Sequence, residues 1–132
     1  MNDLKAKILE LRKSKVEANR RTCIGLLETF LATNPGDVEA WYAKAGCHDF
    51  LGEEQAALPC YHKVYAIGWR ELPEKDQPSF FVGYGSTLRN NLAFDESSDR
   101  LAESIQHFPN YPALKVFQAL SLYSQAKVCG PV

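Results

Sequence analysis

Residues 37–67 of this 132-residue chain, "DVEAWYAKAGCHDFLGEEQAALPCYHKVYAI", decide its fold. Asp37 can accept hydrogen bonds from the free N–H groups at the start of a helix, so a helix is predicted over residues 38–51. Gly52 can adopt the left-handed conformation that ends a helix and turns the chain. A second helix is predicted from there to Gly68, because no period-two alternation indicates a strand. The stretch therefore predicts a hairpin of two helices.

Helical signals extend over the rest of the chain. Leu4, Ile8 and Leu11 fall on one face of a helix near the start. The last helix, over about residues 112–127, is apolar around nearly its whole circumference. Asp95 is expected to cap the start of the helix that comes before this last helix. Further helices are predicted over about residues 22–32 and from Pro78 to about Leu92, which gives an all-α fold of about seven helices.

The sequence also contains an internal repeat. A shift of 40 residues aligns Trp41 with Phe81 and Tyr61 with Leu101. If residues 72–77, "LPEKDQ", are a six-residue insertion, the underlying period is 34 residues, which is the length of a tetratricopeptide repeat.

In this register the opening hairpin resembles a tetratricopeptide repeat. The residues at the family's signature positions are Trp41, Ala45, Gly52, Ala57 and Tyr61. The small side chains allow the two helices of a hairpin to approach closely, and the large ones fill the space beside them. The signature thus specifies packing and not chemistry.

Residues 84–109 resemble a second repeat, with Gly85, Leu88, Leu101 and Pro109 in place. This repeat departs from the family's preference for Gly, Ala and Ala at three positions, which hold Leu92, Ser97 and Ser104. The stretch "LLETFLATNP" resembles the outer helix of an earlier repeat, and "ALKVFQALSLYSQ" resembles the inner helix of a later one.

The resemblance covers nearly the whole chain, which is similar to a subgroup of short bacterial tetratricopeptide repeat proteins, mostly of unassigned function. It implies a right-handed α–α superhelix of antiparallel helix pairs, a TPR-like solenoid. The chain is expected to form a single domain, 1–132, built from a partial repeat 1–36, repeats 37–71 and 78–111, and a partial repeat 112–132.

The composition is that of an ordinary globular protein, with 45% hydrophobic residues, 23% charged residues and a formal net charge of −1. No apolar run reaches the roughly 18 residues that a membrane span requires. The start of the chain does not resemble a secretory signal. We therefore expect a cytoplasmic protein without a membrane partner, in which the four cysteines are reduced thiols.

Positive charge is concentrated in residues 1–21, which carry seven Lys or Arg against three Asp or Glu. Such a segment could attract nucleic acid, so a regulatory or nucleic-acid-associated protein is the alternative hypothesis. No aromatic residue is interleaved for base stacking. We favour the interpretation that the charges form the solvated face of an amphipathic helix.

Cys47, His48, Cys60 and His62 could form a metal site, a thiol active site or neither. Their spacing matches neither a C-x2-4-C turn nor a pair at i, i+3 or i, i+4 on one helix face. No oxyanion hole or lid is indicated for a Cys–His nucleophile. We interpret the cysteines as small apolar core residues and expect no metal, no cofactor, no catalytic residue and no enzymatic activity.

Arrays of tetratricopeptide repeats present their inner helices along a concave surface, so the resemblance implies a protein or peptide partner. The expected groove has an aromatic and apolar floor and a few polar groups, formed by Tyr42, Phe50, Val82, Asp49, Arg89 and Asn90. The Lys, Asn and Arg residues with which some members clamp the carboxylate of a chaperone tail have no counterparts in this sequence.

The last helix lacks a following outer helix in the sequence. One apolar side should pack on the preceding hairpin, and the other has no predicted partner in the chain. A two-fold homodimer through Leu122 and Tyr123 is one expectation. The alternative is that the tail folds back over this face.

Overall fold

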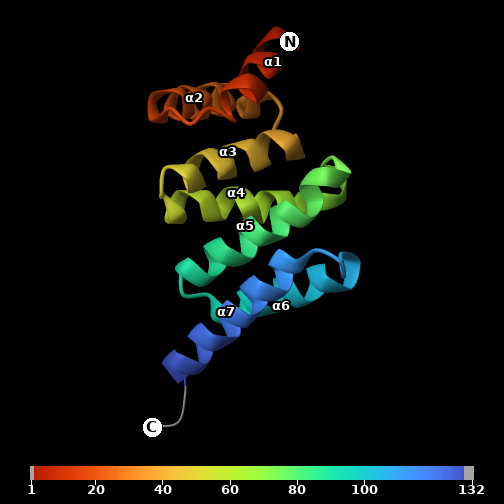
Figure 1. Cartoon of the computed structure of the whole chain (residues 1–132). Helices are drawn as coiled ribbons and strands as arrows, with labels where there is room; N and C mark the ends of the chain where they lie inside the picture. Colours follow the sequence, from red (N-terminus) through yellow and green to blue (C-terminus); the bar gives the residue numbers. More distant parts are fainter. Residues whose placement is uncertain (1, 130–132) are drawn as a thin grey trace. The chain divides into compact units, whose positions relative to one another are not determined.

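The computed structural model describes residues 2–129, and within this range the chain is helical without any strand (Figure 1). This confirms the predicted all-α class of paired helices. The α-helices are α1 (Asn2–Leu11), α2 (Glu17–Thr33), α3 (Val38–Phe50), α4 (Glu54–Ile67), α5 (Gln77–Asn90), α6 (Phe94–His107) and α7 (Pro112–Cys129). Two short 3-10 helices, η1 (Trp69–Glu71) and η2 (Glu74–Asp76), lie between α4 and α5.

The chain divides into two compact units, residues 1–72 and residues 73–132. The division falls within the segment "LPEKDQ", where the sequence predicts an insertion between repeats. The single-domain organisation and the repeat boundaries remain predictions.

In the first unit, α3 and α4 form the antiparallel hairpin that the opening stretch predicts (Figure 1). Asp37 Oδ1 accepts a hydrogen bond of 3.0 Å from the Ala40 N–H, which caps α3. Gly52 has a φ of 74°, which an L residue with a side chain rarely adopts. Both local signals are confirmed.

The core of the first unit is formed by α1, α2 and the hairpin. Ala45 and Ala57, both fully buried, leave room for α3 and α4 to approach each other. Pro59 lies inside α4, which continues to Ile67, so the proline does not end the helix. The largest connected cluster of buried residues comprises Ile8, Cys23, Ile24, Leu27, Phe30, Leu31, Ala40, Ala43 and Cys47.

The helix predicted over about residues 22–32, which is α2, is longer than its sequence signals indicate. It begins at Glu17 and not near residue 22. Its N-cap residue, Val16, makes no side-chain cap bond, so the sequence carries no capping signal at this point. The backbone N–H groups of Asn19 and Arg20 both donate to the Val16 carbonyl and start the helix there.

In the second unit, buried hydroxyl groups connect α5, α6 and α7. Ser97 Oγ donates to the Gly85 carbonyl at 2.7 Å and lies 2.6 Å from Ser121 Oγ. Both serines are fully buried. The departure from alanine at position 97 thus places a hydroxyl group where it joins all three helices.

The turn between α5 and α6 corrects one prediction. Asp95 lies in the first turn of α6 and is not its cap, because the N-cap residue is Ala93, which makes no side-chain cap bond. The chain turns through Leu92, whose φ is 66°. Leu92 therefore takes the left-handed conformation that Gly52 takes in the first hairpin.

Candidate functional site

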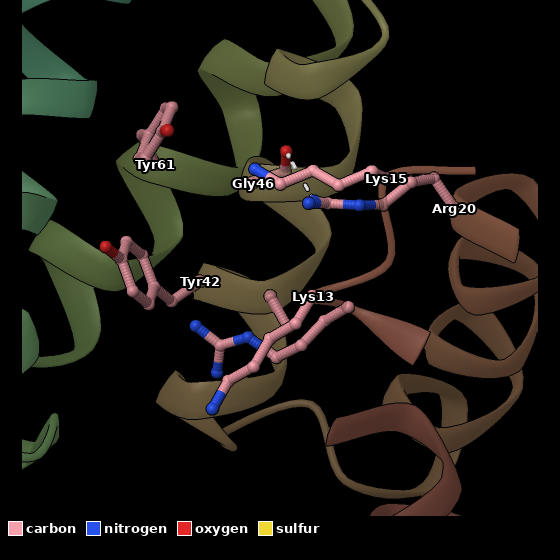
Figure 2. Close-up of a pocket in the computed structure, with 8 residues that line it drawn as sticks. Lys13, Lys15, Arg20, Tyr42, Gly46 and Tyr61 are labelled. Atoms are coloured by element: carbon pink, nitrogen blue, oxygen red, sulfur yellow. Dashed lines mark hydrogen bonds between the residues drawn. The ribbon is translucent and has the colours of Figure 1, made fainter. Parts of the chain in front are cut away.

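A pocket of about 280 Å3 lies between the α1–α2 connection, residues 12–16, and the side of α3 (Figure 2). The connection supplies three basic residues, and α2, α3 and α4 supply the rest of the wall. We call this site the basic pocket. Its lining residues are Arg12, Lys13, Lys15, Arg20, Tyr42, Ala43, Gly46 and Tyr61.

Arg20 is held in place by groups on three sides. It is 9% exposed, and its Nε donates to the Ser14 carbonyl. Its Nη1 lies 3.5 Å from the Gly46 carbonyl oxygen, the contact drawn in Figure 2. The guanidinium carbon also stands 4.2 Å from the ring centroid of Phe50. The guanidinium group is thus fixed beside the pocket.

The other basic residues of the pocket are less buried. The Arg12 guanidinium lies 5.4 Å from the ring centroid of Tyr42, which is a cation–π distance. Lys15 extends toward Gly46 alongside Arg20, and Lys13 approaches from the side of Tyr42 (Figure 2). None of the four cations forms an ion pair with another residue of the described range 2–129, and no Asp or Glu lines the pocket. The wall therefore presents uncompensated positive charge.

Tyr61 is oriented by Asp49. Its hydroxyl donates to Asp49 Oδ2 at 2.9 Å, from α4 to α3. Burial raises the pKa of the Asp49 carboxyl, and the hydrogen bond from Tyr61 opposes this change. Burial also raises the pKa of the Tyr61 phenol well above its ordinary value, and the neighbouring Asp49 charge adds to the effect. The hydrogen bond thus joins α4 to α3 at this end of the pocket wall.

The cysteines of the opening stretch occupy the core. Cys47 is fully buried and is paired with the buried thiol of Cys23. The hydrogen bond between them lowers the pKa of Cys47 and raises that of Cys23, and Arg20 further lowers the pKa of Cys47. Cys60 is 3% exposed, and burial raises the pKa of its thiol. These thiols fill the interior, as the sequence predicts for small apolar residues.

The histidines do not join the cysteines in a metal site. His48 Nδ1 lies 2.9 Å from Glu53 Oε1, and Glu53 Oε2 in turn lies 2.7 Å from Arg21 Nη1. Within residues 2–129 no three His, Cys, Asp or Glu side chains gather closely enough to hold a metal ion. His48 therefore belongs to a hydrogen-bonded network with Glu53 and Arg21 at the end of the hairpin.

The six predicted groove residues divide between the two units. Tyr42 lines the basic pocket, Phe50 supports Arg20, and Asp49 orients Tyr61. Arg89 and Asn90 line a second cavity, within residues 73–132. Val82 is half-buried on α5. A continuous groove formed by all six residues remains a prediction.

The sequence did not indicate that basic residues line a pocket together with Tyr42. Its pattern placed Arg12 and Lys13 on the solvated face of a helix, but α1 ends at Leu11 and both residues lie in the connection. The excess of Lys and Arg in residues 1–21 was the available signal. The aromatic partner is distant in sequence, so no local pattern could place it beside Arg12.

The paired helices define a helical repeat protein. The chain matches the family described as tetratrico peptide repeat over residues 38–130. It belongs to this family, which confirms the resemblance found in the sequence. Proteins of this family are generally interaction modules that bind other proteins.

No curated protein matches the sequence. In the part of the chain that the structure describes, every helix is too short or too polar to cross a membrane.

Proposed function

We propose that the chain is a non-enzymatic protein-binding module and that the basic pocket holds an acidic segment of its partner. The observation that carries this proposal is the set of four cations around the pocket, which lacks any lining carboxylate. A partner that supplies Asp or Glu side chains would provide the missing charge.

The pocket offers two kinds of contact to such a segment. The fixed guanidinium of Arg20 can donate to a carboxylate with little loss of side-chain freedom, because it is already buried and hydrogen-bonded. The Tyr42 ring offers an apolar surface beside the charges. Lys13 and Lys15 can follow the partner's charges, since ammonium groups on long stems adapt to different geometries.

Gly46 allows a test that leaves every charge in place. A Cβ atom added to Gly46 would have no other heavy atom within 4 Å, so the pocket is open at this point. A side chain in Gly46→Met would therefore occupy the pocket. Gly25→Met is the matched control, because Gly25 is an exposed residue of α2 with equally open surroundings.

The experiment measures capture of proteins from native extract by the wild-type chain and by both variants. We expect the same bound protein with the wild type and with Gly25→Met, at least tenfold less with Gly46→Met, and competition by a soluble Glu-rich peptide. Equal capture by all three chains would contradict the proposal.

The nucleic-acid hypothesis has one supporting observation, which is the Arg12–Tyr42 contact beside the lysines. The same experiment separates the two functions. Loss of the captured material after nuclease treatment, or competition by a single-stranded oligonucleotide in place of the peptide, would favour nucleic acid.

We also propose that α7 joins two copies of the chain. Leu122 is 50% exposed and Tyr123 is 59% exposed, and Val116 and Leu120 on the same helix are exposed as well. Large apolar side chains that gather on one helix favour association. A two-fold dimer would bury the same helix of both copies.

A further inference from the structure

A second cavity, of about 470 Å3, lies where the α5–α6 turn meets the C-terminal half of α7, within residues 73–132. One part of its wall is polar and the other is apolar. The lining residues are Arg89, Asn90, Ser124 and Lys127 on the polar side and Leu92 and Phe94 on the apolar side. We call this site the α7 cavity.

One N–H group of the Arg89 guanidinium lacks a hydrogen-bond acceptor. Its Nε atom is buried and has no hydrogen-bond partner. A buried guanidinium N–H without an acceptor is unfavourable, and native proteins rarely leave one unsatisfied. Lys127 adds a second cation, and no Asp or Glu lines the cavity. The polar side therefore carries positive charge that an anion with oxygen acceptors would balance.

Leucine is an unfavourable residue at position 92 for two reasons. Among the described residues Leu92 is the one non-glycine with a positive φ, 66°, where glycine would fit without strain. Its side chain is also 74% exposed. A leucine that is both strained and exposed gains nothing from the core, and such backbone strain is typical of binding sites. In this position it supplies an apolar wall beside Arg89.

We propose that the α7 cavity binds an aliphatic carboxylic acid. Its carboxylate lies against the Arg89 guanidinium group, the Asn90 amide and the Lys127 ammonium group. Its hydrocarbon part covers the side chains of Leu92 and Phe94. The cavity has the size and the mixture of apolar wall and few polar groups that small-molecule sites share. This site does not depend on the basic pocket or on the proposed protein partner.

Octanoate is the probe, and octanamide is its control, because the amide keeps the hydrocarbon chain and removes the charge. Binding is measured by isothermal titration calorimetry below the concentration at which octanoate forms micelles. Chemical shifts of the Leu92 methyl groups report the location. We expect saturable binding of octanoate at Leu92 and at least tenfold weaker binding of octanamide.

Two variants test the residues, each with a melting curve beside the titration. Leu92→Gly should melt at the same or a higher temperature, because it removes the strain, and yet bind octanoate at least tenfold more weakly. Arg89→Gln should reduce the preference for octanoate over octanamide. Ile67→Gln is the control, because Ile67 is 37% exposed at the end of α4 and lies outside residues 73–132, which hold the cavity.

Three results would overturn the proposal. Octanoate and octanamide could bind equally, Leu92→Gly could bind octanoate as tightly as the wild type, or no binding could be detected at millimolar octanoate. Each of these results leaves capture of a protein by the basic pocket unaffected, so the two proposals fail separately.

Discussion

Gly85 on α5 lies so close to Leu101 on α6 that a Cβ atom added to Gly85 would stand 2.6 Å from Leu101 Cγ. Leu101 is fully buried, so its side chain cannot move out into solvent. The absence of a side chain at residue 85 is therefore a packing requirement. The sequence predicts this contact, because Gly85 and Leu101 occupy signature positions of the repeat.

Gly85→Ala is expected to destabilise the chain by about 1–3 kcal/mol, because overpacking outweighs the usual gain of about 1 kcal/mol for alanine over glycine in a helix. Gly25→Ala is the control, since a Cβ atom there meets no other heavy atom within 4 Å. It should stabilise the chain by about 0.5–1 kcal/mol. Denaturant unfolding of the two variants checks both signs, and a stabilised Gly85→Ala chain would contradict the packing argument.

Tyr61→Phe is expected to lower the unfolding free energy by about 1–2 kcal/mol at neutral pH, because Asp49 loses a hydrogen-bond donor. The pKa of Tyr61 is raised well above 10.0, so the folded state disfavours the phenolate. The Tyr61 hydroxyl therefore makes its full contribution to the unfolding free energy below pH 10, and this contribution is lost as the pH rises above 10.

The difference in unfolding free energy between wild type and Tyr61→Phe should accordingly shrink as the pH rises from 9 to 11. The decrease should not exceed about 1 kcal/mol per pH unit. Tyr123→Phe is the control, because Tyr123 is 59% exposed. Chemical denaturation at several pH values checks the slope. A difference between wild type and Tyr61→Phe that stays constant to pH 11 would show that Tyr61 is not a buried phenol.

The features that could be predicted from the sequence are those with a local cause. Asp37 caps a helix because of its own side chain, and Gly52 turns the chain because of its own backbone freedom. Arg20 is different, since its partners are the carbonyl groups of Ser14 and Gly46 and the ring of Phe50. The fold of the connection between α1 and α2 brings these groups together, and no periodicity encodes that connection.

The second cavity shows the same limit. The repeat register places Arg89 and Asn90 on an inner helix, and both residues line this cavity. The repeat pattern gave no reason to predict Leu92 as a site residue, because it identified Leu92 only as a departure from the glycine that the family prefers. Its strain and exposure depend on the backbone conformation of the turn, which the sequence pattern does not specify.

Ala57→Leu is expected to cost about 1–3 kcal/mol, because Ala57 is fully buried where α4 packs on α3. Ala66 lies near the end of the same helix and is exposed, so Ala66→Leu should change stability by less than about 0.5 kcal/mol. Thermal melting of both variants checks the difference. Equal melting temperatures would mean that the assigned repeat register is wrong.

Removal of metal is expected to have no effect. Cys47 and Cys60 lie in the core, His48 is hydrogen-bonded to Glu53, and the spacing of the Cys and His residues does not assemble a tetrahedral site. The melting temperature should be the same with and without a strong chelator. One zinc ion per purified chain in elemental analysis would refute this prediction.

Leu122→Glu tests the proposed dimer through α7. Leu122 is 50% exposed, so a monomer tolerates glutamate at this position, whereas a two-fold interface would bring two carboxylates together in an apolar contact. We expect light scattering to show a dimer for the wild type at high concentration and a monomer for Leu122→Glu. Ile67→Glu, at a 37% exposed residue at the end of α4, is the matched control and should remain dimeric. A wild-type chain that is monomeric at every concentration would remove the proposal, and a dimer indifferent to Leu122→Glu would place the interface on another surface.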